Sequence, residues 1–315
     1  MKIAKNITLF LVLGFFALII GFDIWGALTL GTITPDPSAA RDENANRVVL
    51  VAGATGSVGD GLLKAAIEDP NVEKVYVITR RTSPRIDEGV ASGKVDMLLH
   101  KDFTDYSSLA DVLVEVNTVL WGLGTSSLQV DEETYTWIHV DFPVAFVKAW
   151  LSARTEAPMA FHYVTGMGTG EDESAKWAQD KGRAEREVAE MAEGTGLRTF
   201  GYRSAYIRPT TERANVLNYI GEVLLRPGKL VITSKELGGA MLEISARRDE
   251  LANGTLIDNA DSIAYAAAYR ENNPGGCSGD DTSVDMASEE TATVEALRKP
   301  ETLAERRELR REIAD

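Results

Sequence analysis

The sequence is poor in cysteine, histidine and positive charge. Its single cysteine, Cys277, cannot form an internal disulfide. The histidines His100, His139 and His162 lie far apart without the spacing of metal ligands, so we expect packing or surface roles for them and no metal site. The 33 basic residues against 48 acidic ones give a net charge of -15. This balance argues against a nucleic-acid partner, because phosphate binding depends on clustered lysine and arginine.

A long uncharged run begins at residue 7 and continues to residue 22, and Trp25 and Leu28 extend its apolar character beyond Asp23. A membrane-spanning helix needs about 20 mainly apolar residues. We therefore predict a single N-terminal membrane anchor over residues 7–30. A cleaved signal peptide is the alternative, but no small-residue cleavage site directly follows residue 22.

The rest of the chain divides into three parts by composition. Residues 31–46 are typical of a linker, because Pro35 and Pro37 oppose regular structure. In residues 47–272, short β-branched runs alternate with longer helical stretches, which is typical of a mostly parallel sheet covered by helices on both faces. Residues 273–315 predict a disordered acidic segment and a charged tail, since they cannot bury enough apolar surface to fold.

The central part therefore predicts a doubly wound α/β domain with a Rossmann-type sheet and a small C-terminal helical lobe. We expect strands at 48–52, 74–79, 95–100, 118–121, 160–164 and 198–202, helices at 57–68, 106–113, 132–153 and 174–192, and lobe helices at 214–225, 235–247 and 261–269. In such a sheet the ligand binds in the crevice at the carboxyl ends of the strands.

A glycine-rich turn follows the first predicted strand. Gly53 permits the tight turn out of the strand, Gly56 lets the backbone approach a pyrophosphate, and Gly59 allows the next helix to pack close to the sheet. The strand before and the helix after this turn favour dinucleotide binding over a purely structural turn. A P-loop is excluded, because no Gly-Lys-Ser/Thr follows.

The second predicted strand ends in Thr79-Arg80-Arg81, where an NAD site usually places an acidic residue that binds the ribose. Two guanidinium groups suit a 2′-phosphate instead. We therefore predict NADP as the cofactor and consider NAD the weaker candidate; an ordinary solvated arginine pair is the alternative.

With these features the sequence resembles the short-chain dehydrogenase/reductase superfamily, specifically the atypical branch that includes the HIV Tat-interacting-protein-like NAD(P)-binding proteins. The likeness runs from about residue 47 to residue 269. The likeness rests on four groups of residues: Gly53, Ala54, Thr55, Gly56, Ser57, Val58 and Gly59; Arg80, Arg81, Asp102 and Phe103; Gly122, Leu123, Gly124 and Thr125; and residues 202–205, 236–242 and 253–259. The resemblance implies that Asp102 and Phe103 lie at the adenine and that residues 122–125 pass beneath the cofactor. It also implies that Thr165 lies near the catalytic serine position.

The catalytic segment departs from the family. The family's Tyr-x-x-x-Lys pair places a proton-transferring phenol one helical turn from a lysine that lowers its pKa and holds the nicotinamide ribose. Lys181 keeps its place in this sequence, but Trp177 occupies the tyrosine position. An indole donates a hydrogen bond and cannot cycle a proton near neutral pH. Trp177 is alternatively an aromatic side chain that packs over the cofactor pocket.

Two functions therefore stay open. The chain is either an NADP-dependent oxidoreductase that takes its proton from Tyr206, Tyr163 or a water on Thr165, or a non-catalytic NADP-binding scaffold or redox sensor. The sequence identifies neither a small-molecule substrate nor a protein partner. Lys2 and Lys5 favour a cytoplasmic N-terminus, which with a single span would place the folded domain on the opposite side of the membrane. NADP, however, is plentiful in the cytosol. We therefore expect the folded domain to face the cytoplasm.

Overall fold

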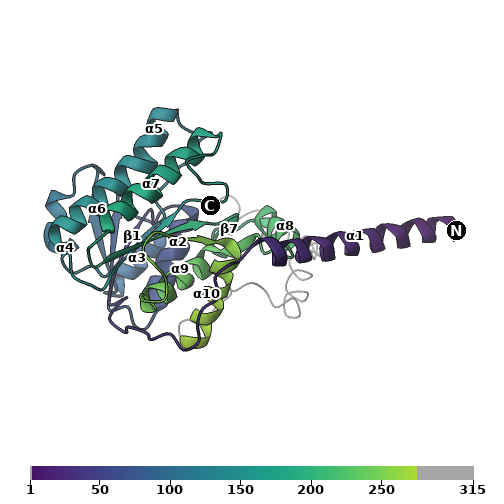
Figure 1. The fold of residues 1–315 in the computed structure, drawn as a ribbon, viewed down its shortest axis with the longest axis horizontal. Coiled ribbons are helices and arrows are strands. Elements are labelled where there is room, and N and C mark those ends of the chain that lie inside the picture. Colours follow the sequence, from purple (N-terminus) through teal and green to yellow (C-terminus); the bar gives the residue numbers. More distant parts are fainter. Residues whose placement is uncertain (1, 275–315) are drawn as a thin grey trace, which may run out of the picture.

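Figure 1 shows the fold in a computed structural model, which describes the backbone of residues 2–274 and the side chains from residue 13 onward, except that of residue 15. Cys277 and all but the first two residues of the predicted acidic segment and tail at 273–315 lie outside the described residues.

A seven-stranded parallel sheet forms the centre of the protein. Its strands are β1 (Val48–Ala52), β2 (Lys74–Thr79), β3 (Val95–Leu99), β4 (Thr118–Trp121), β5 (Met159–Val164), β6 (Leu197–Arg203) and β9 (Thr255–Asp258). They lie in the order β3-β2-β1-β4-β5-β6-β9, and every neighbouring pair is parallel. The predicted doubly wound α/β sheet is therefore confirmed, with the reversal of strand order between β1 and β4.

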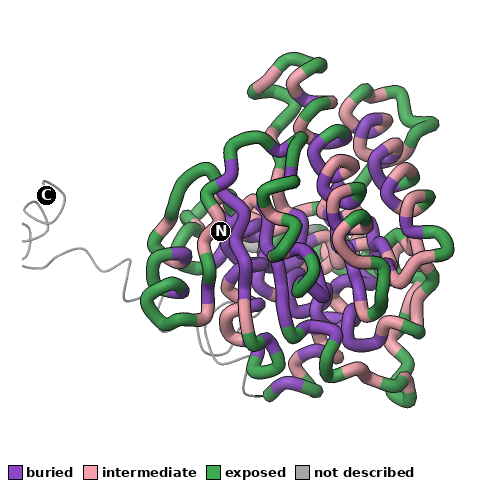
Figure 2. Tube along the Cα trace, turned by 90° about the vertical axis from the view of Figure 1, so that its left-hand side faces the viewer, coloured by how far each residue is buried: buried purple, intermediate pink, exposed green. Residues whose placement is uncertain are grey.

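Helices cover both faces of the sheet because its central strands are apolar on both sides. Val49 and Val51 of β1 belong to one core layer, whereas Val48 and Leu50 belong to the other. The first layer also contains α2 (Ser57–Glu68), α3 (Pro84–Ala91), α9 (Ser234–Ala246) and α10 (Asn259–Asn272). The second contains α4 (Ala110–Leu113), α6 (Phe142–Ala153) and α7 (Lys176–Ala192). Figure 2 shows these buried layers at the centre of the molecule.

The expected C-terminal helical lobe was wrong for two of its three helices. Every residue of α9 except Glu236 is buried, and α9 packs against α2 and α10 as part of a helical layer of the sheet. What remains outside the sheet is a small unit of β7 (Tyr206–Arg208), β8 (Val231–Thr233) and α8 (Val216–Leu225). The polar residues of α9, among them Lys235, Glu243 and Ser245, are buried together with its apolar ones, so its sequence did not indicate a place in the core.

Several other elements differ from the expectation. The predicted helix at 132–153 is interrupted, because the π-helical turn η2 (Trp137–Asp141) separates α5 (Glu132–Thr136) from α6. The helix expected at 106–113 consists of the 3-10 turn η1 (Ser107–Leu109) followed by α4. The elements α3, β7, β8 and β9 were not predicted, because their eight or fewer residues are too short for a clear periodic pattern.

The N-terminal helix α1 (Lys2–Thr29) projects away from the domain (Figure 1). Within the part of the chain that the structure describes, none of the helices has both the length and the apolarity to cross a bilayer. The following segment, predicted as a linker, contains no helix or strand but is held by the domain. The Gly31 amide donates to Asp258 Oδ2 at 2.7 Å and the Ile33 amide to Asp261 Oδ1 at 2.9 Å.

Candidate functional site

The parallel strands bring the predicted site segments to one edge of the sheet. Ala52 at the end of β1 pairs with Ile78 of β2 and with Trp121 of β4, and Trp121 pairs with Tyr163 of β5. The turns that follow these four strands therefore meet at their carboxyl ends. The glycine-rich turn, the two arginines, residues 122–125 and Thr165 all lie in these turns.

The three glycines of the glycine-rich turn differ in how much room the fold leaves for a side chain. Gly53 has a φ of +83°, and a Cβ on it would lie 2.5 Å from the Leu123 amide nitrogen. A Cβ on Gly59 would lie 2.1 Å from the Gly53 carbonyl oxygen. Packing alone therefore excludes a side chain at both positions. At Gly56 the nearest atom to such a Cβ would be the Gly53 oxygen, at 3.2 Å. A side chain at Gly56 would thus need a shift of only a few tenths of an ångström, and Gly56 is exposed, so the surface beside it stays open to a ligand.

Helix α2 begins at this turn and presents its amino end there. Gly56 is its N-cap and supplies no side-chain hydrogen bond. Free amides and the positive end of the helix dipole favour an anion at this position. Asp60 in the first turn would oppose an anion, but it is buried and paired with Arg85, whose Nε lies 3.1 Å from Asp60 Oδ1. The local charge at the amino end of α2 is therefore balanced.

Arg213 also contacts the turn and was not foreseen from the sequence. Its Nη1 donates to the Gly56 oxygen at 2.8 Å and to the Thr55 oxygen at 3.1 Å. The same segment is fixed by Thr210, which donates from Oγ1 to Asp60 Oδ2 at 2.7 Å. The loop between β7 and α8 thus places a guanidinium group where a pyrophosphate is expected. The sequence held no signal for this contact, since it depends on unrecognised short strands.

Arg80 and Arg81 are exposed at the end of β2, and neither forms an ion pair with a described residue. The Thr79 hydroxyl fixes the backbone of this turn by donating to the Arg81 oxygen at 2.6 Å. Both arginine side chains are therefore available to an anion.

The two residues expected at the adenine, Asp102 and Phe103, differ in their exposure to solvent. Asp102 is exposed, and hydrogen bonds from Thr104 lower its pKa, whereas Phe103 is buried and stacks on Phe142 at a centroid distance of 5.3 Å.

The segment after β4 packs closely on both sides. A Cβ on Gly122 would lie 3.3 Å from the Cα of Gly59, and one on Gly124 would lie 2.7 Å from His139 Cε1. His139 belongs to η2, and its Nε2 lies 3.1 Å from the Thr125 amide nitrogen. Burial, followed by the nearby Lys181 charge, lowers the pKa of His139 to about 4, so the ring is neutral at pH 7. The packing role expected for this histidine agrees with its burial and with its stacking on Tyr135 at a centroid distance of 4.1 Å.

Lys181 is oriented toward the end of β5. Its ammonium group donates to the Thr165 carbonyl oxygen, and burial lowers its pKa to about 8. The Thr165 hydroxyl is already engaged, because its Oγ1 lies 2.6 Å from Glu185 Oε1. Glu185 in turn pairs with Arg203 at 2.7 Å. The Thr165 carbonyl oxygen therefore accepts from Lys181, and the Thr165 hydroxyl group is bound to Glu185.

The side chains considered as proton donors occupy different environments. Trp177 is half-buried in the first turn of α7, and its Cη2 lies 3.7 Å from the position of a Cβ on Gly168. Tyr163 is buried, donates to the His139 oxygen at 2.7 Å and has a pKa raised well above its usual value by burial. Tyr206 accepts from Asn218 Nδ2 at 2.9 Å, on the side of α8. None of these three side chains makes a described hydrogen bond to Lys181.

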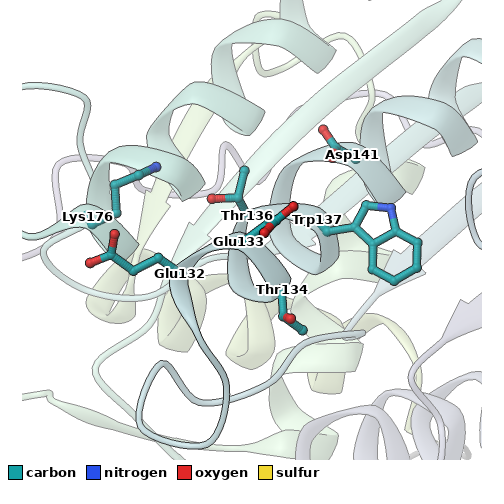
Figure 3. Close-up of a pocket in the computed structure, with 7 residues that line it drawn as sticks. All are labelled: Glu132, Glu133, Thr134, Thr136, Trp137, Asp141 and Lys176. Atoms are coloured by element: carbon teal, nitrogen blue, oxygen red, sulfur yellow. The ribbon is translucent and has the colours of Figure 1, made fainter.

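An open cavity of about 600 Å³ lies between α5 and the start of α7 (Figure 3). It is lined by Glu132, Glu133, Thr134, Thr136, Trp137, Asp141 and Lys176. Thr136 and Lys176 both bond to Asp180, which precedes Lys181. The cavity thus adjoins the lysine helix but includes no residue of the glycine-rich turn.

The sequence matches no known protein-family profile. Among curated proteins it is 25% identical over 144 residues to the leucinostatins biosynthesis cluster protein T of Purpureocillium lilacinum, a match that covers 45% of this chain and 51% of that protein. The match thus spans about half the length of this curated relative.

Two solved structures indicate the fold. An oxidoreductase of the short-chain dehydrogenase/reductase family from Burkholderia thailandensis has a TM-score of 0.50 and 15% identity, over 69% of this chain and 92% of that one. The Bordetella bronchiseptica enzyme WbmF, solved with NAD+ and UDP, has a TM-score of 0.52 and 14% identity, over 77% of this chain and 82% of that one. The protein therefore has the fold of short-chain dehydrogenases/reductases, and the atypical branch suggested by the sequence stays a prediction.

Proposed function

We propose that this chain binds a nicotinamide dinucleotide at the carboxyl edge of its sheet. The observation that carries the proposal is the glycine-rich turn, where Gly56 leaves open surface at the uncapped amino end of α2. A pyrophosphate fits this position, because the amides and the helix dipole favour an anion and Arg85 balances the charge of Asp60. The Bordetella enzyme that shares this fold was solved with NAD+.

NADP is the form that we propose as preferred. Arg80 and Arg81 support this choice, since both are exposed at the end of β2 and unpaired among the described residues. A guanidinium group binds a 2′-phosphate through charge-assisted hydrogen bonds, each worth about 1.5 to 3 kcal/mol. This contribution corresponds to more than tenfold discrimination against NAD.

Two functions of this site, one catalytic and one non-catalytic, are supported by different residues. A bound nicotinamide ring would supply hydride transfer. Lys181 favours an NADP-dependent oxidoreductase, because it retains the position that orients the ribose and has a pKa of about 8. Trp177, the buried Tyr163 and the engaged Thr165 hydroxyl favour a non-catalytic NADP-binding scaffold or redox sensor. We propose binding as the common function, with slow turnover of a still unidentified small-molecule substrate.

We further propose that the N-terminal helix attaches the protein to a membrane with the folded domain on the cytoplasmic side. The exposed apolar side chains of α1 support attachment, among them Leu18 and Leu28, which are 70% and 80% exposed. The availability of NADP in the cytosol supports the orientation. Digestion of the domain by protease added to intact cells would contradict this orientation, because the membrane protects a cytoplasmic domain from external protease.

Calorimetric titration of the full chain in detergent with NADPH and with NADH tests the cofactor proposal. We expect binding of both cofactors, with NADPH bound at least tenfold more tightly. Arg80→Asp with Arg81→Ala should remove that preference, whereas Arg186→Ala, on the outer side of α7, should leave it unchanged. Equal affinities in the wild type would exclude the preference for NADP, and no heat with either cofactor would exclude dinucleotide binding.

A further inference from the structure

Helix α8 presents its apolar side chains to the outside. Five of them are half or more exposed, namely Val216, Leu217, Ile220, Val223 and Leu224. At 3.6 residues per turn they fall in one stripe about 120° wide. Its one buried residue is the acidic Glu222. This arrangement is the reverse of an ordinary surface helix, and an exposed apolar stripe of this kind marks an interaction surface.

Charged contacts hold α8 in this orientation. Glu222 Oε2 lies 2.7 Å from Arg208 Nε, both side chains are buried, and Arg226 binds the other carboxylate oxygen of Glu222. The Arg208 guanidinium also lies 5.1 Å from the centre of the Tyr219 ring. Turning the apolar stripe inward would break a buried ion pair, which costs about 3 to 5 kcal/mol. The outward stripe is therefore a fixed feature of the fold.

Helix α1 packs beside the carboxyl end of α8. A Cβ on Gly26 of α1 would lie 2.4 Å from the Gly228 oxygen, and the Phe22 ring covers Gly228. Figure 1 shows α8 next to the end of α1 that joins the domain. Beyond this contact α1 has six large apolar side chains more than half exposed: Leu13, Phe16, Leu18, Ile20, Ile24 and Leu28. The two helices thus present neighbouring apolar surfaces.

The charge around these surfaces differs from that of the rest of the chain. The protein carries a net charge of -15, yet residues 1–35 and 213–229 contain only two acidic side chains, Asp23 and Glu222, and Glu222 is buried. Three basic residues flank α8 in sequence: Lys229, Arg226, which also pairs with Glu222, and Arg213, which follows the acidic Glu212. An apolar stripe with basic flanks is typical of a helix that lies at the surface of an anionic bilayer.

We propose that the outer face of α8 lies on a phospholipid bilayer, with its apolar stripe at the boundary between headgroups and acyl chains. This inference rests on the proposed membrane attachment through α1 and adds a second contact, which fixes the orientation of the domain. Because Asn215 caps α8 and Arg213 contacts the glycine-rich turn, that orientation brings the dinucleotide site close to the lipid surface.

Fluorescence quenching in vesicles tests the proposal with the full chain. In a Cys277→Ser background, single cysteines are introduced as Ile20→Cys on α1, Ile220→Cys on α8 and Leu128→Cys as a control, since Leu128 is 94% exposed before α5. Each carries an environment-sensitive fluorophore, and the vesicles contain phosphatidylcholine, phosphatidylglycerol and a lipid with a spin label near its headgroup. We expect a blue shift and loss of emission at positions 20 and 220, and neither change at position 128.

The outcomes separate the two proposals. Quenching at 20 without quenching at 220 would overturn the α8 contact and leave the attachment standing, and quenching at neither position would overturn both. A blue shift at 220 that grows with protein concentration in the absence of vesicles would show that a second copy covers α8, and would overturn the lipid contact. In the Ile220→Cys chain, the added pair Leu217→Glu and Val223→Glu should abolish quenching, whereas the same pair should not affect position 20.

Discussion

At the scale of single residues, some glycines of the glycine-rich turn are required by packing and another is left for ligand binding. Added side chains at Gly53 and Gly59 would collide with backbone atoms, so these two glycines are required by the fold whether or not a ligand binds. Gly56 has no such collision. The sequence motif predicts a different role for each glycine, and the packing distances agree that Gly53 and Gly59 are needed by the fold whereas Gly56 leaves more room.

The first prediction concerns Gly56→Ala. We expect the variant to keep the thermal unfolding midpoint of the wild type and to lose stabilisation by NADPH, because a methyl group would occupy the path of the pyrophosphate. A ligand at 100 times its Kd stabilises a folded protein by about 2.7 kcal/mol, so the loss is measurable by thermal unfolding. The control is Gly59→Ala, which should lower the midpoint without ligand, since its Cβ would lie 2.1 Å from the Gly53 oxygen. Full NADPH stabilisation of folded Gly56→Ala would make the turn purely structural.

The second prediction concerns Trp177→Tyr. Trp177 lies one helical turn before Lys181, whose lowered pKa of about 8 suits it to tune a neighbouring phenol. Since general acid catalysis contributes roughly 10² to 10⁴-fold, the variant should oxidise NADPH with aldehydes or ketones at least about 10²-fold faster than the wild type. Lys181→Met added to Trp177→Tyr should remove the gain. A wild-type rate that falls on Trp177→Tyr and on Tyr206→Phe would instead identify a working enzyme with a different acid.

At the scale of elements, a buried polar cluster joins β5, β6 and α9. His162 Nδ1 lies 2.8 Å from the Tyr202 hydroxyl and its Nε2 lies 2.7 Å from the Ser245 hydroxyl. Thr118 of β4 extends the cluster, with its Oγ1 at 3.1 Å from Ser245 Oγ. Burial lowers the pKa of His162 to about 3, so the ring is neutral in the folded protein. These bonds explain why α9 covers the sheet although its sequence includes polar residues.

The third prediction follows from this pKa. Between pH 6.5 and about pH 3 the unfolded chain binds a proton at His162 that the folded chain does not bind, so acid lowers the free energy of unfolding. The contribution of His162 is fully present above pH 6.5 and is lost as the pH falls toward 3, on the order of 5 kcal/mol in total. His162→Gln can keep both hydrogen bonds without titrating. In chemical denaturation at pH 7 and pH 4, the wild type should lose more stability than this variant. Equal losses would show that another group governs the acid sensitivity.

The longer elements were predictable from the sequence, and the shorter ones were not. Strand β1 and helix α2 have the predicted bounds, because a continuous apolar strand and a glycine-marked helix start are local signals. β7, β8 and β9 have three or four residues each and depend on partners far away in the chain. Arg213 was missed for this reason, because its position at Gly56 follows from the course of the chain after β7.

At the scale of the whole molecule, Glu243 joins the N-terminal segment to the domain. Its buried carboxylate binds Arg41 of that segment, Arg247 of the turn after α9, and Asn272 of α10, whose Nδ2 lies 2.9 Å away. Charge and hydrogen bonds therefore fasten residues 31–46, which the sequence predicted as a linker. This fastening relates the direction of α1 to the rest of the fold.

The fourth prediction concerns Glu243→Gln, which removes the buried charge that Arg41 and Arg247 share and leaves Arg247 with the more distant Glu250, at 3.5 Å. We expect a loss of about 3 kcal/mol in the free energy of unfolding, together with protease cleavage within residues 31–46. Arg41→Met is the matched control, because Glu243 then keeps Arg247 and Asn272; this variant should be cleaved with a smaller loss of stability. Resistance of both variants to protease would show that Glu243 does not hold the segment.

The sequence by itself determined the alternation of strands and helices, the position of the glycine-rich turn after the first strand and the spacing of Trp177 and Lys181, because these are properties of neighbouring residues. Tertiary structure alone decided that α9 belongs to the core, that Arg213 reaches Gly56 and that the Thr165 hydroxyl is bound by Glu185. It also decided that α8 turns its apolar stripe outward, which the helical pattern of α8 leaves open. The physical reason is the same in each case: helical periodicity shows that a helix has two faces, but only long-range contacts such as the Arg208–Glu222 pair decide which face is buried.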